Sequence, residues 1–264
     1  MLEKITASPT LGPETANTFT AGVVIQPRMV RNLSITLDYY NLSVAKSIAT
    51  LGASFIMSQC YVTGTDQSLC PNVIRDANGV VQQIDDPRAN TGNYHTTGID
   101  FAIRYAQAVE DFGRFSFILD GTYLNSFRFT DVGGTVINGA GNYDLGALPK
   151  WKTNAGIFWT LGPIGAGVSG RYFGGFKECF AGGDFLCSED DSQQHRVVSF
   201  LPIDLFVSYT LRDWVAGTTS AVVGVQNVGN VEPPYISSGF AANSDPSSYD
   251  YIGRFVYARL THTF

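Results

Sequence analysis

The sequence predicts an all-β protein, an antiparallel transmembrane β-barrel segment of about nine strands with long loops at one end and short turns at the other. Three observations predict this fold. The composition is rich in aromatic residues and glycine and poor in charge, apolar and polar residues alternate with a period of two, and the connections alternate between short and long.

The composition favours strands and tight turns over surface helices. The 264 residues include 18 Phe, 13 Tyr and 28 Gly, whereas only 15% are charged. Aromatic side chains suit the pleated surface of a sheet, and glycine suits turns. The net charge of -6, without a clustered basic face, argues against a nucleic-acid partner.

The alternation of apolar and polar residues is clearest from Gly98 to Gln107, where Ile99, Phe101 and Ile103 alternate with smaller or charged residues. The expected strands are about 10 to 14 residues long, close to the 9 to 11 that cross a bilayer at a tilt. The other strongly alternating segments are Leu33–Tyr40, Ile203–Leu211 and Val256–Phe264, and weaker ones are Ala16–Gln26, Arg114–Phe129, Trp151–Leu161, Ile164–Gly174 and Thr218–Asn227.

The lengths of the connections alternate along the chain. Outer-membrane barrels have short periplasmic turns and longer extracellular loops, so this rhythm favours a barrel. The short connections are Pro27–Asn32, Ala108–Gly113, Gly162–Pro163 and Arg212–Gly217, and the long ones are Ala45–Tyr94, Thr130–Lys150, Gly175–Ser199 and Val228–Asp250. Within the first long loop we expect a short helix in Ala45–Tyr61. A soluble secreted β-sandwich stays open as an alternative, because alternation alone does not exclude it.

Four cysteines form two close pairs in the expected loops, Cys60 with Cys70 and Cys179 with Cys187. This spacing predicts two local disulfides, which persist in an oxidising compartment. A zinc site is the alternative, but neither pair has the Cys-x-x-Cys spacing and His195 is the only histidine nearby.

Five segments in order along the chain resemble TonB-dependent outer-membrane receptors. Ser8 and Gly12 in the first segment, and Val228 in the fourth, depart from the residues most common in the family. The segments are Ser8-Pro-Thr-Leu-Gly-Pro-Glu-Thr, which leads into the strand at Ala16, Ile35-Thr-Leu-Asp-Tyr-Tyr-Asn-Leu, Asn93-Tyr-His-Thr-Thr-Gly-Ile-Asp, Val225-Gln-Asn-Val-Gly-Asn-Val-Glu-Pro-Pro, and Gly253-Arg-Phe-Val-Tyr-Ala-Arg-Leu-Thr-His-Thr-Phe.

This resemblance implies a barrel of about 22 strands in the outer membrane of a Gram-negative bacterium, with a lumen closed by an N-terminal plug. Residues 1–264 then correspond to the C-terminal part of the barrel, with the plug and the first barrel half missing. The implied partners are outer-membrane lipid, the TonB complex acting through the plug, and the barrel-assembly machinery, for which Phe264 is the C-terminal assembly signal. The implied function is energy-coupled uptake of a siderophore, vitamin or oligosaccharide, and we expect the chain alone to be inactive in transport.

No catalytic, cofactor-binding or metal-binding set emerges from the sequence. His95, His195 and His262 lie in separate segments, and Gly167-Val-Ser-Gly lacks the spacing of a nucleophile elbow. An acidic stretch suggests either calcium binding or a solvated loop, and the absence of a regular Asp-x-Asp-x-Asp-Gly spacing favours the loop. Its residues are Asp184, Glu189, Asp190 and Asp191.

Two further sets of residues are expected to face the lumen or a ligand. Charged residues that alternate with lipid-facing positions avoid the cost of the bilayer by facing the lumen. These are Asp38, Asp100, Arg104, Asp120, Asp204 and Arg259. Aromatic residues in the expected loops either stack on a small-molecule or glycan substrate or pack on one another. These are Tyr94, Tyr143, Phe176, Phe180, Tyr235, Phe240 and Tyr249. The remaining rival function is a small porin or adhesin that closes by oligomerising.

Overall fold

The computed structural model describes residues 2–64, 67–179, 194–214, 216–239 and 241–264. The chain divides into two compact units, each of which is described by itself. Unit 1 comprises Met1–Phe19, Asn41–Thr96 and Phe127–Ile137, and unit 2 comprises Thr20–Tyr40, Thr97–Ser126 and Asn138–Phe264. None of the helices in the described ranges is both long enough and apolar enough to cross a membrane.

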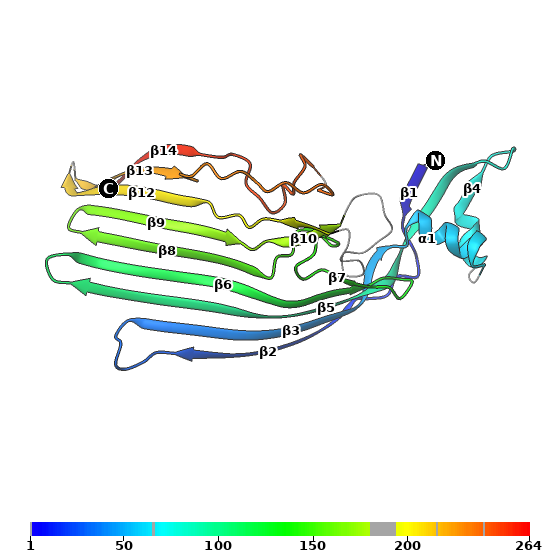
Figure 1. The fold of residues 1–264 in the computed structure, drawn as a ribbon, viewed down its shortest axis with the longest axis horizontal. Coiled ribbons are helices and arrows are strands. Elements are labelled where there is room, and N and C mark those ends of the chain that lie inside the picture. Colours follow the sequence, from blue (N-terminus) through cyan, green and yellow to red (C-terminus); the bar gives the residue numbers. More distant parts are fainter. Residues whose placement is uncertain (1, 65–66, 180–193, 215, 240) are drawn as a thin grey trace. The chain divides into compact units, whose positions relative to one another are not determined.

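Nine long strands follow one another across the main sheet in the order β14-β13-β12-β9-β8-β6-β5-β3-β2 (Figure 1). The nine predicted strands are therefore confirmed. The sheet is open, with β2 and β14 at its edges. The strands are β2 (Thr15–Ile25), β3 (Leu33–Thr50), β5 (Val81–Val109), β6 (Gly113–Thr130), β8 (Trp151–Leu161), β9 (Ile164–Phe173), β12 (Ile203–Trp214), β13 (Gly217–Gln226) and β14 (Phe255–Thr263).

Neighbouring strands are joined by tight turns at one end of the sheet. We call this end of the sheet the turn end. From β6 to β14 the neighbouring pairs are antiparallel. Asn32, Asp111 and Gly162 have φ values of 61°, 64° and 55°. Asn, Asp and Gly adopt this left-handed conformation at least cost, which explains why the chain reverses there. The opposite end, which carries the long connections, is called the loop end.

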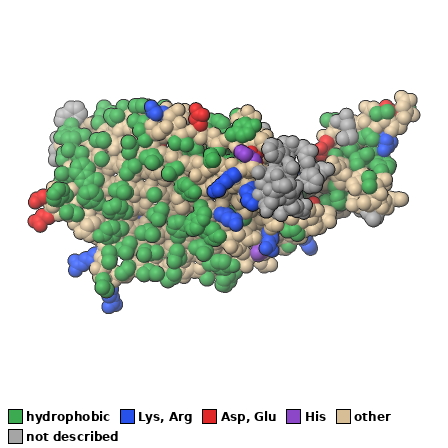
Figure 2. All heavy atoms as spheres, viewed as in Figure 1, with side chains coloured by type: hydrophobic (Ala, Val, Ile, Leu, Met, Phe, Trp, Pro, Cys, Tyr) green, Lys and Arg blue, Asp and Glu red, His purple; other side chains and the backbone are tan. Residues whose placement is uncertain are grey.

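One face of the sheet is apolar and exposed. Ile157 lies opposite Val168, Val168 opposite Leu205, Leu205 opposite Val225 and Val225 opposite Val256, so the row crosses five strands. Exposure reaches 45% for Ile157 and 64% for Val256. Figure 2 shows hydrophobic side chains spread over this face. A contiguous apolar surface of this kind indicates contact with lipid or another protein.

The other face combines polar side chains with large aromatic rings that lie over glycines. The rings of Phe158 and Phe206 have centroids 6.1 Å apart. Gly167 lies between them in the register, and a Cβ there would come within 2.4 Å of Phe206 and 2.7 Å of Phe158. Glycine is therefore required at position 167 for the two rings to cover the sheet.

The long connections contain more regular structure than predicted. Ala45–Tyr94 was expected to be a loop, but β3 continues to Thr50 and β5 begins at Val81. These extensions carry polar residues on both faces, so the alternation that marks a membrane strand is absent although backbone pairing continues. The additional short strands are β1 (Leu2–Thr6), β4 (Val73–Arg75), β7 (Val136–Asn138), β10 (Phe176–Cys179) and β11 (Gln194–Val197).

The helix expected within Ala45–Tyr61 is shorter and begins later. Helix α1 covers Ala53–Met57 and continues into a π-helical turn at Ser58–Val62, followed by a 3-10 helix at Gln67–Asn72. The first part of the expected helix belongs to β3. Strand pairing therefore prevails over local helix propensity up to Thr50.

Unit 1 holds these helices through a buried carboxylate, a disulfide and a small core. The backbone amides of Leu51 and Gly52 donate to Asp86, which is 1% exposed, over 2.9 and 3.1 Å. Cys60 and Cys70 are disulfide-bonded with Cα atoms 5.2 Å apart, which confirms the predicted pairing. The core residues are Ile56, Val73 and Ile84. Of the second predicted pair, Cys187 lies outside the described residues.

The apolar core of unit 2 lies at the loop end of the sheet. Its buried residues come from the long connections and from the short strands β10 and β11. They are Ala147, Phe176, Val197, Phe200, Ile236 and Tyr249, and we call this group the loop core. The membrane-type strands thus carry little buried apolar surface, and the loops are organised by a core of their own.

Candidate functional site

Two features of unit 2 are candidates for function. One is a polar hollow on the polar face of the sheet, and the other is the group of long connections that packs around the loop core. The first is lined by residues of β3, β5, β6 and β8. The second shapes the loop end.

The polar hollow has a volume of about 440 Å³ and combines carboxylates with one amine. Arg104 pairs with Asp120 at 2.5 Å, and the Thr122 hydroxyl donates to Asp100 over 2.5 Å. Among its lining residues are Asp38, Asp100, Asp120, Thr122, Lys152 and Asn154. The hollow can accept hydrogen bonds from a polar solute or from a protein segment packed against this face.

The structure brings four of the six predicted lumen residues together. Asp38, Asp100 and Asp120 line the polar hollow, and Arg104 is bonded to Asp120. Asp204 lies apart and accepts a hydrogen bond from the Asn227 amide at 2.8 Å. Arg259 is on β14, opposite Val222.

The connection from β13 to β14 begins with an asparagine that closes a local turn. The Asn227 side chain accepts a hydrogen bond from the Val231 amide and donates one to the Val231 carbonyl, both at 2.8 Å. Asn230 then accepts from the Arg254 amide over 3.0 Å. Asparagine at these positions therefore brings the two ends of the long connection together.

At the loop end, β10 and β11 form a two-stranded antiparallel ribbon (Figure 1). Glu178 lies directly opposite His195 in this ribbon. The side chain of Glu178 is fully buried, whereas that of His195 is 46% exposed. Burial of a carboxylate destabilises the folded state unless the carboxylate is hydrogen-bonded, so the stability of this region depends on the hydrogen-bond donors around Glu178.

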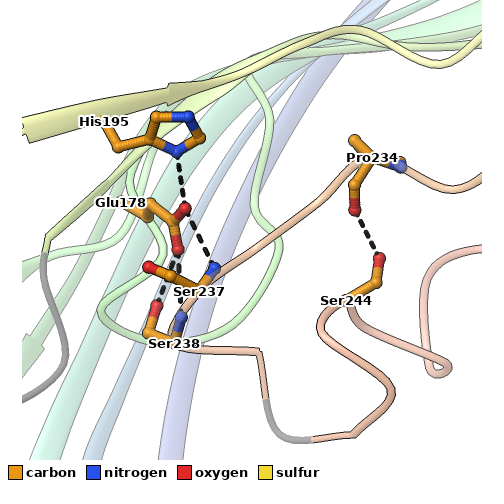
Figure 3. A network of polar contacts seen from close by, with 6 residues as sticks. All are labelled: Glu178, His195, Pro234, Ser237, Ser238 and Ser244. Carbon is orange, nitrogen blue, oxygen red and sulfur yellow. Dashed lines mark hydrogen bonds and ion pairs between the residues drawn. The ribbon is translucent and has the colours of Figure 1, made fainter.

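Glu178 accepts four hydrogen bonds, as Figure 3 shows. His195 Nδ1 lies 2.6 Å from Oε1, and the Ser237 amide donates to the same oxygen over 3.0 Å. The amide and the hydroxyl of Ser238 donate to Oε2 over 3.1 and 3.0 Å. One carboxylate thus joins β10, β11 and the connection from β13 to β14, and we call this arrangement the Glu178 clasp.

The clasp shifts the ionisation of its carboxylate. Burial opposes ionisation of Glu178, but the amides of Ser237 and Ser238 and the side chains of His195 and Ser238 outweigh it. The pKa of Glu178 is therefore lower than its ordinary value. Near neutral pH the clasp holds an ionised carboxylate.

A second buried carboxylate organises the same connection. Asp245 accepts from the amide of Ser247 at 3.0 Å and from its hydroxyl at 2.5 Å, and the Tyr143 hydroxyl lies 3.3 Å from its other oxygen. Burial, followed by the nearby Asp245 carboxylate, raises the pKa of Tyr249 above its ordinary value. Tyr249 is 4% exposed, and its hydroxyl group stays protonated and neutral.

The clasp holds loops together and does not form a nucleophile pair. The Ser238 hydroxyl donates to the carboxylate and not to the imidazole of His195. A general base would have to accept that proton to activate the serine. In the described part of the chain, no group of three or more His, Cys, Asp or Glu side chains could hold a metal ion.

The predicted loop aromatics separate into different environments. Tyr94 lies within β5, and its ring centroid is 4.7 Å from that of Phe129. Tyr143 stacks on the buried Phe176 at 5.8 Å, whereas Tyr235 is 60% exposed. Phe180 and Phe240 lie outside the described residues. The expectation that these residues contact a ligand stays a prediction.

Glu178 was not among the residues predicted from the sequence. Its amide and hydroxyl partners lie 59 and 60 residues further along the chain, and no local pattern connects them. The one available signal was a lone glutamate beside apolar and aromatic residues in a segment expected to be a polar loop.

The comparisons with known proteins agree with the fold. The family described as TonB dependent receptor-like, beta-barrel matches residues 3–228. The chain belongs to this family, which is typical of the outer membrane of Gram-negative bacteria. No curated protein sequence matched the chain.

Solved structures of receptors with this fold are similar to the chain. The siderophore receptor PirA from Acinetobacter baumannii aligns over 96% of this chain and 32% of its own, with 18% identity and a TM-score of 0.61. The FrpB iron transporter from Neisseria meningitidis aligns over 97% and 31%, with 14% identity and a TM-score of 0.61. A mutant of the ferric enterobactin receptor PfeA from Pseudomonas aeruginosa aligns over 95% and 31%, with 14% identity and a TM-score of 0.62. The chain thus spans about a third of the length of each.

Proposed function

We propose that the chain supplies the closing strands of the barrel of an outer-membrane importer, which takes up a scarce nutrient by TonB-dependent, energy-coupled transport. The observation that carries the proposal is the two-faced sheet. Its apolar face is exposed, and its polar face carries charged residues. This is the distribution that a bilayer outside and a hydrated lumen inside require.

The proposal includes partners that complete the transporter. The sheet is open between β2 and β14, so closure requires further strands. In the arrangement we propose, an N-terminal plug packs against the polar face, and the TonB complex acts on that plug. The chain alone is then inactive in transport. The barrel-assembly machinery inserts the strands.

For the substrate we propose a ferric siderophore first, with a vitamin or oligosaccharide as the other candidates. Support comes from the polar hollow, which offers hydrogen-bonding groups, and from neighbours named as siderophore and iron receptors. The loop aromatics predicted from the sequence, including the exposed Tyr235, are the proposed ligand contacts at the loop end.

Uptake measurements test the proposal. Deletion of the gene from its host should abolish or reduce uptake of one member of a panel of ferric chelates, cobalamin and oligosaccharides. Inactivation of TonB in the undeleted host should cause the same loss. Unchanged uptake of the whole panel after deletion would contradict an importer.

Location and assembly provide a second test. The chain should fractionate with the outer membrane and need detergent to stay folded once extracted. A monomer that stays folded in detergent-free buffer would support the soluble sandwich and overturn the membrane proposal. A homo-oligomer that closes the barrel by itself, detected by cross-linking in membranes, would support the rival porin or adhesin.

A further inference from the structure

Tight turns fix the register of some neighbouring strands in the main sheet but not of others. Strands β8 and β9 are joined by a tight turn, and Leu161 and Ile164 on either side of it lie opposite each other. A turn of this length decides which residues pair. Strands β9 and β12 are joined by residues 174–202, and β13 and β14 by residues 227–254. Connections of this length leave the register to be decided by the strands themselves.

The apolar face of the sheet does not select a single register for β13 and β14. On this face Val223 lies opposite Ala258, and Val225 lies opposite Val256. A shift of one residue would bring polar side chains of one strand onto the apolar face. A shift of two residues places Val223 opposite Val256 or Leu260, which are also apolar. Three registers therefore keep the apolar face intact.

The polar face distinguishes these three registers. Tyr257 lies directly opposite Gly224, and a Cβ at Gly224 would lie 2.5 Å from Cζ of the Tyr257 ring. A shift of two residues would place Tyr257 opposite Val222 or Gln226. Each of these carries a side chain where the ring now covers bare backbone. Of the three registers, the observed one alone leaves room for the ring.

Strands β9 and β12 are related in the same way. Phe206 lies opposite Gly167, and a Cβ at Gly167 would come within 2.4 Å of the Phe206 ring. A shift of two residues in one direction places Phe206 opposite Ser169, which carries a side chain. The shift in the other direction places it opposite Gly165, but it brings β12 alongside Pro163, which precedes β9 and has no amide to donate.

We propose that these two contacts select the register in which consecutive hairpins of the sheet join, Tyr257 over Gly224 for β13 and β14, and Phe206 over Gly167 for β9 and β12. Each ring fits over bare backbone and collides with a side chain, so it raises the free energy of the slipped registers. The apolar face decides which side of a strand points outward, and the ring decides how far the strand slides. The proposal is independent of any transported substrate.

Thiol cross-linking of the full chain in membranes measures the register of β13 and β14. Each reporter combines Val223→Cys with one cysteine on the apolar face of β14, so the polar face stays unchanged. The reporter with Ala258→Cys detects the observed register. The reporters with Leu260→Cys and Val256→Cys detect the two slipped registers. Peptide mapping by mass spectrometry identifies the joined residues and separates them from the other cysteines of the chain.

An exchange of two residues should move the register in a chosen direction. Gly224→Gln combined with Gln226→Gly shifts the glycine by two positions and keeps the composition. Tyr257 should then lie opposite position 226, so the yield with Ala258→Cys should fall by about fivefold and the yield with Leu260→Cys should rise. Tyr257→Ala should allow cross-links in both slipped registers, because the excluding ring is gone.

A matched exchange controls for disturbance of the strand. Ser220→Val combined with Val222→Ser alters the same face of β13, where Thr261 and Arg259 lie opposite and neither is aromatic. This control should keep the observed register. Heat-modifiable migration shows whether each variant folds.

Each outcome supports or overturns the proposal. A glycine exchange that leaves the yield with Ala258→Cys unchanged and gives no cross-link with Leu260→Cys overturns it, and so does equal slippage in the control. If the glycine exchange does not fold, Gly224→Ala is measured with the same reporters. A lowered yield with Ala258→Cys then supports the proposal, and an unchanged yield overturns it.

Discussion

Glu178 and His195 face each other across the ribbon of β10 and β11, with the imidazole Nδ1 2.6 Å from a carboxylate oxygen whose side chain is fully buried. The same carboxylate accepts from the amides of Ser237 and Ser238. Three segments far apart in the sequence therefore depend on one ionised group.

Glu178→Ala should destabilise the loop end. The substitution leaves two amides, a hydroxyl and an imidazole without their acceptor, and such a loss costs about 2 to 5 kcal/mol. Limited proteolysis should cut the connection between β13 and β14 faster, and the unfolding midpoint should fall. Glu232→Ala is the matched control, because Glu232 is an exposed glutamate in the same connection. Equal effects of the two substitutions would contradict the clasp.

The clasp should weaken in acid and not in base. The pKa of Glu178 is lowered in the folded state, so its contribution is complete above the ordinary glutamate value of about 4.3 and is lost as the pH falls through the lower folded value. Proteolysis of the same connection, measured from neutral pH downward, should accelerate in that acidic window. Glu178→Gln should lose this dependence. A Gln variant whose pH profile parallels that of the wild type would refute the assignment.

Ile103→Arg and Arg104→Ala should have very different effects. Ile103 alternates with Arg104, whose partner Asp120 lies in the polar hollow, so Ile103 belongs to the apolar face. An arginine in lipid near the midplane costs about 2 to 4 kcal/mol, whereas an exposed ion pair is worth about 1 kcal/mol or less. Folding into vesicles, followed by heat-modifiable migration, measures both. Similar losses would show that the faces are assigned wrongly.

Removing the disulfide of unit 1 should loosen its helical segment. Substitution of Cys60 and Cys70 by serine removes a short loop closure, which is worth about 3 kcal/mol. Proteolysis within Ala53–Asn72 should increase, and reductant should have no further effect there. Non-reducing mass mapping of the wild type should join Cys60 to Cys70 and also Cys179 to Cys187. A peptide that joins the two pairs crosswise would refute local pairing.

The long strands could be predicted because the different environments of their two faces produce an alternation of residue types along each strand. A residue on the apolar face and its neighbour on the polar face alternate in type, as Ile103 and Arg104 do. This alternation is visible in adjacent residues, so no distant contact has to be known to detect it. The β8 bounds Trp151–Leu161 agree with the prediction at both ends. The extension of β3 to Thr50 and the start of β5 at Val81 were missed, because strands outside the bilayer need no apolar face.

The sequence by itself determined the sheet, its two faces and the Cys60–Cys70 pair, since each is encoded by residues adjacent or close together in the chain. Tertiary structure alone decided the clasp of Glu178 and the burial of Phe176 and Tyr249. Those contacts join separate connections. Hydrogen bonds between segments tens of residues apart depend on the conformation of the loops that carry them. No periodicity in the sequence indicates that conformation.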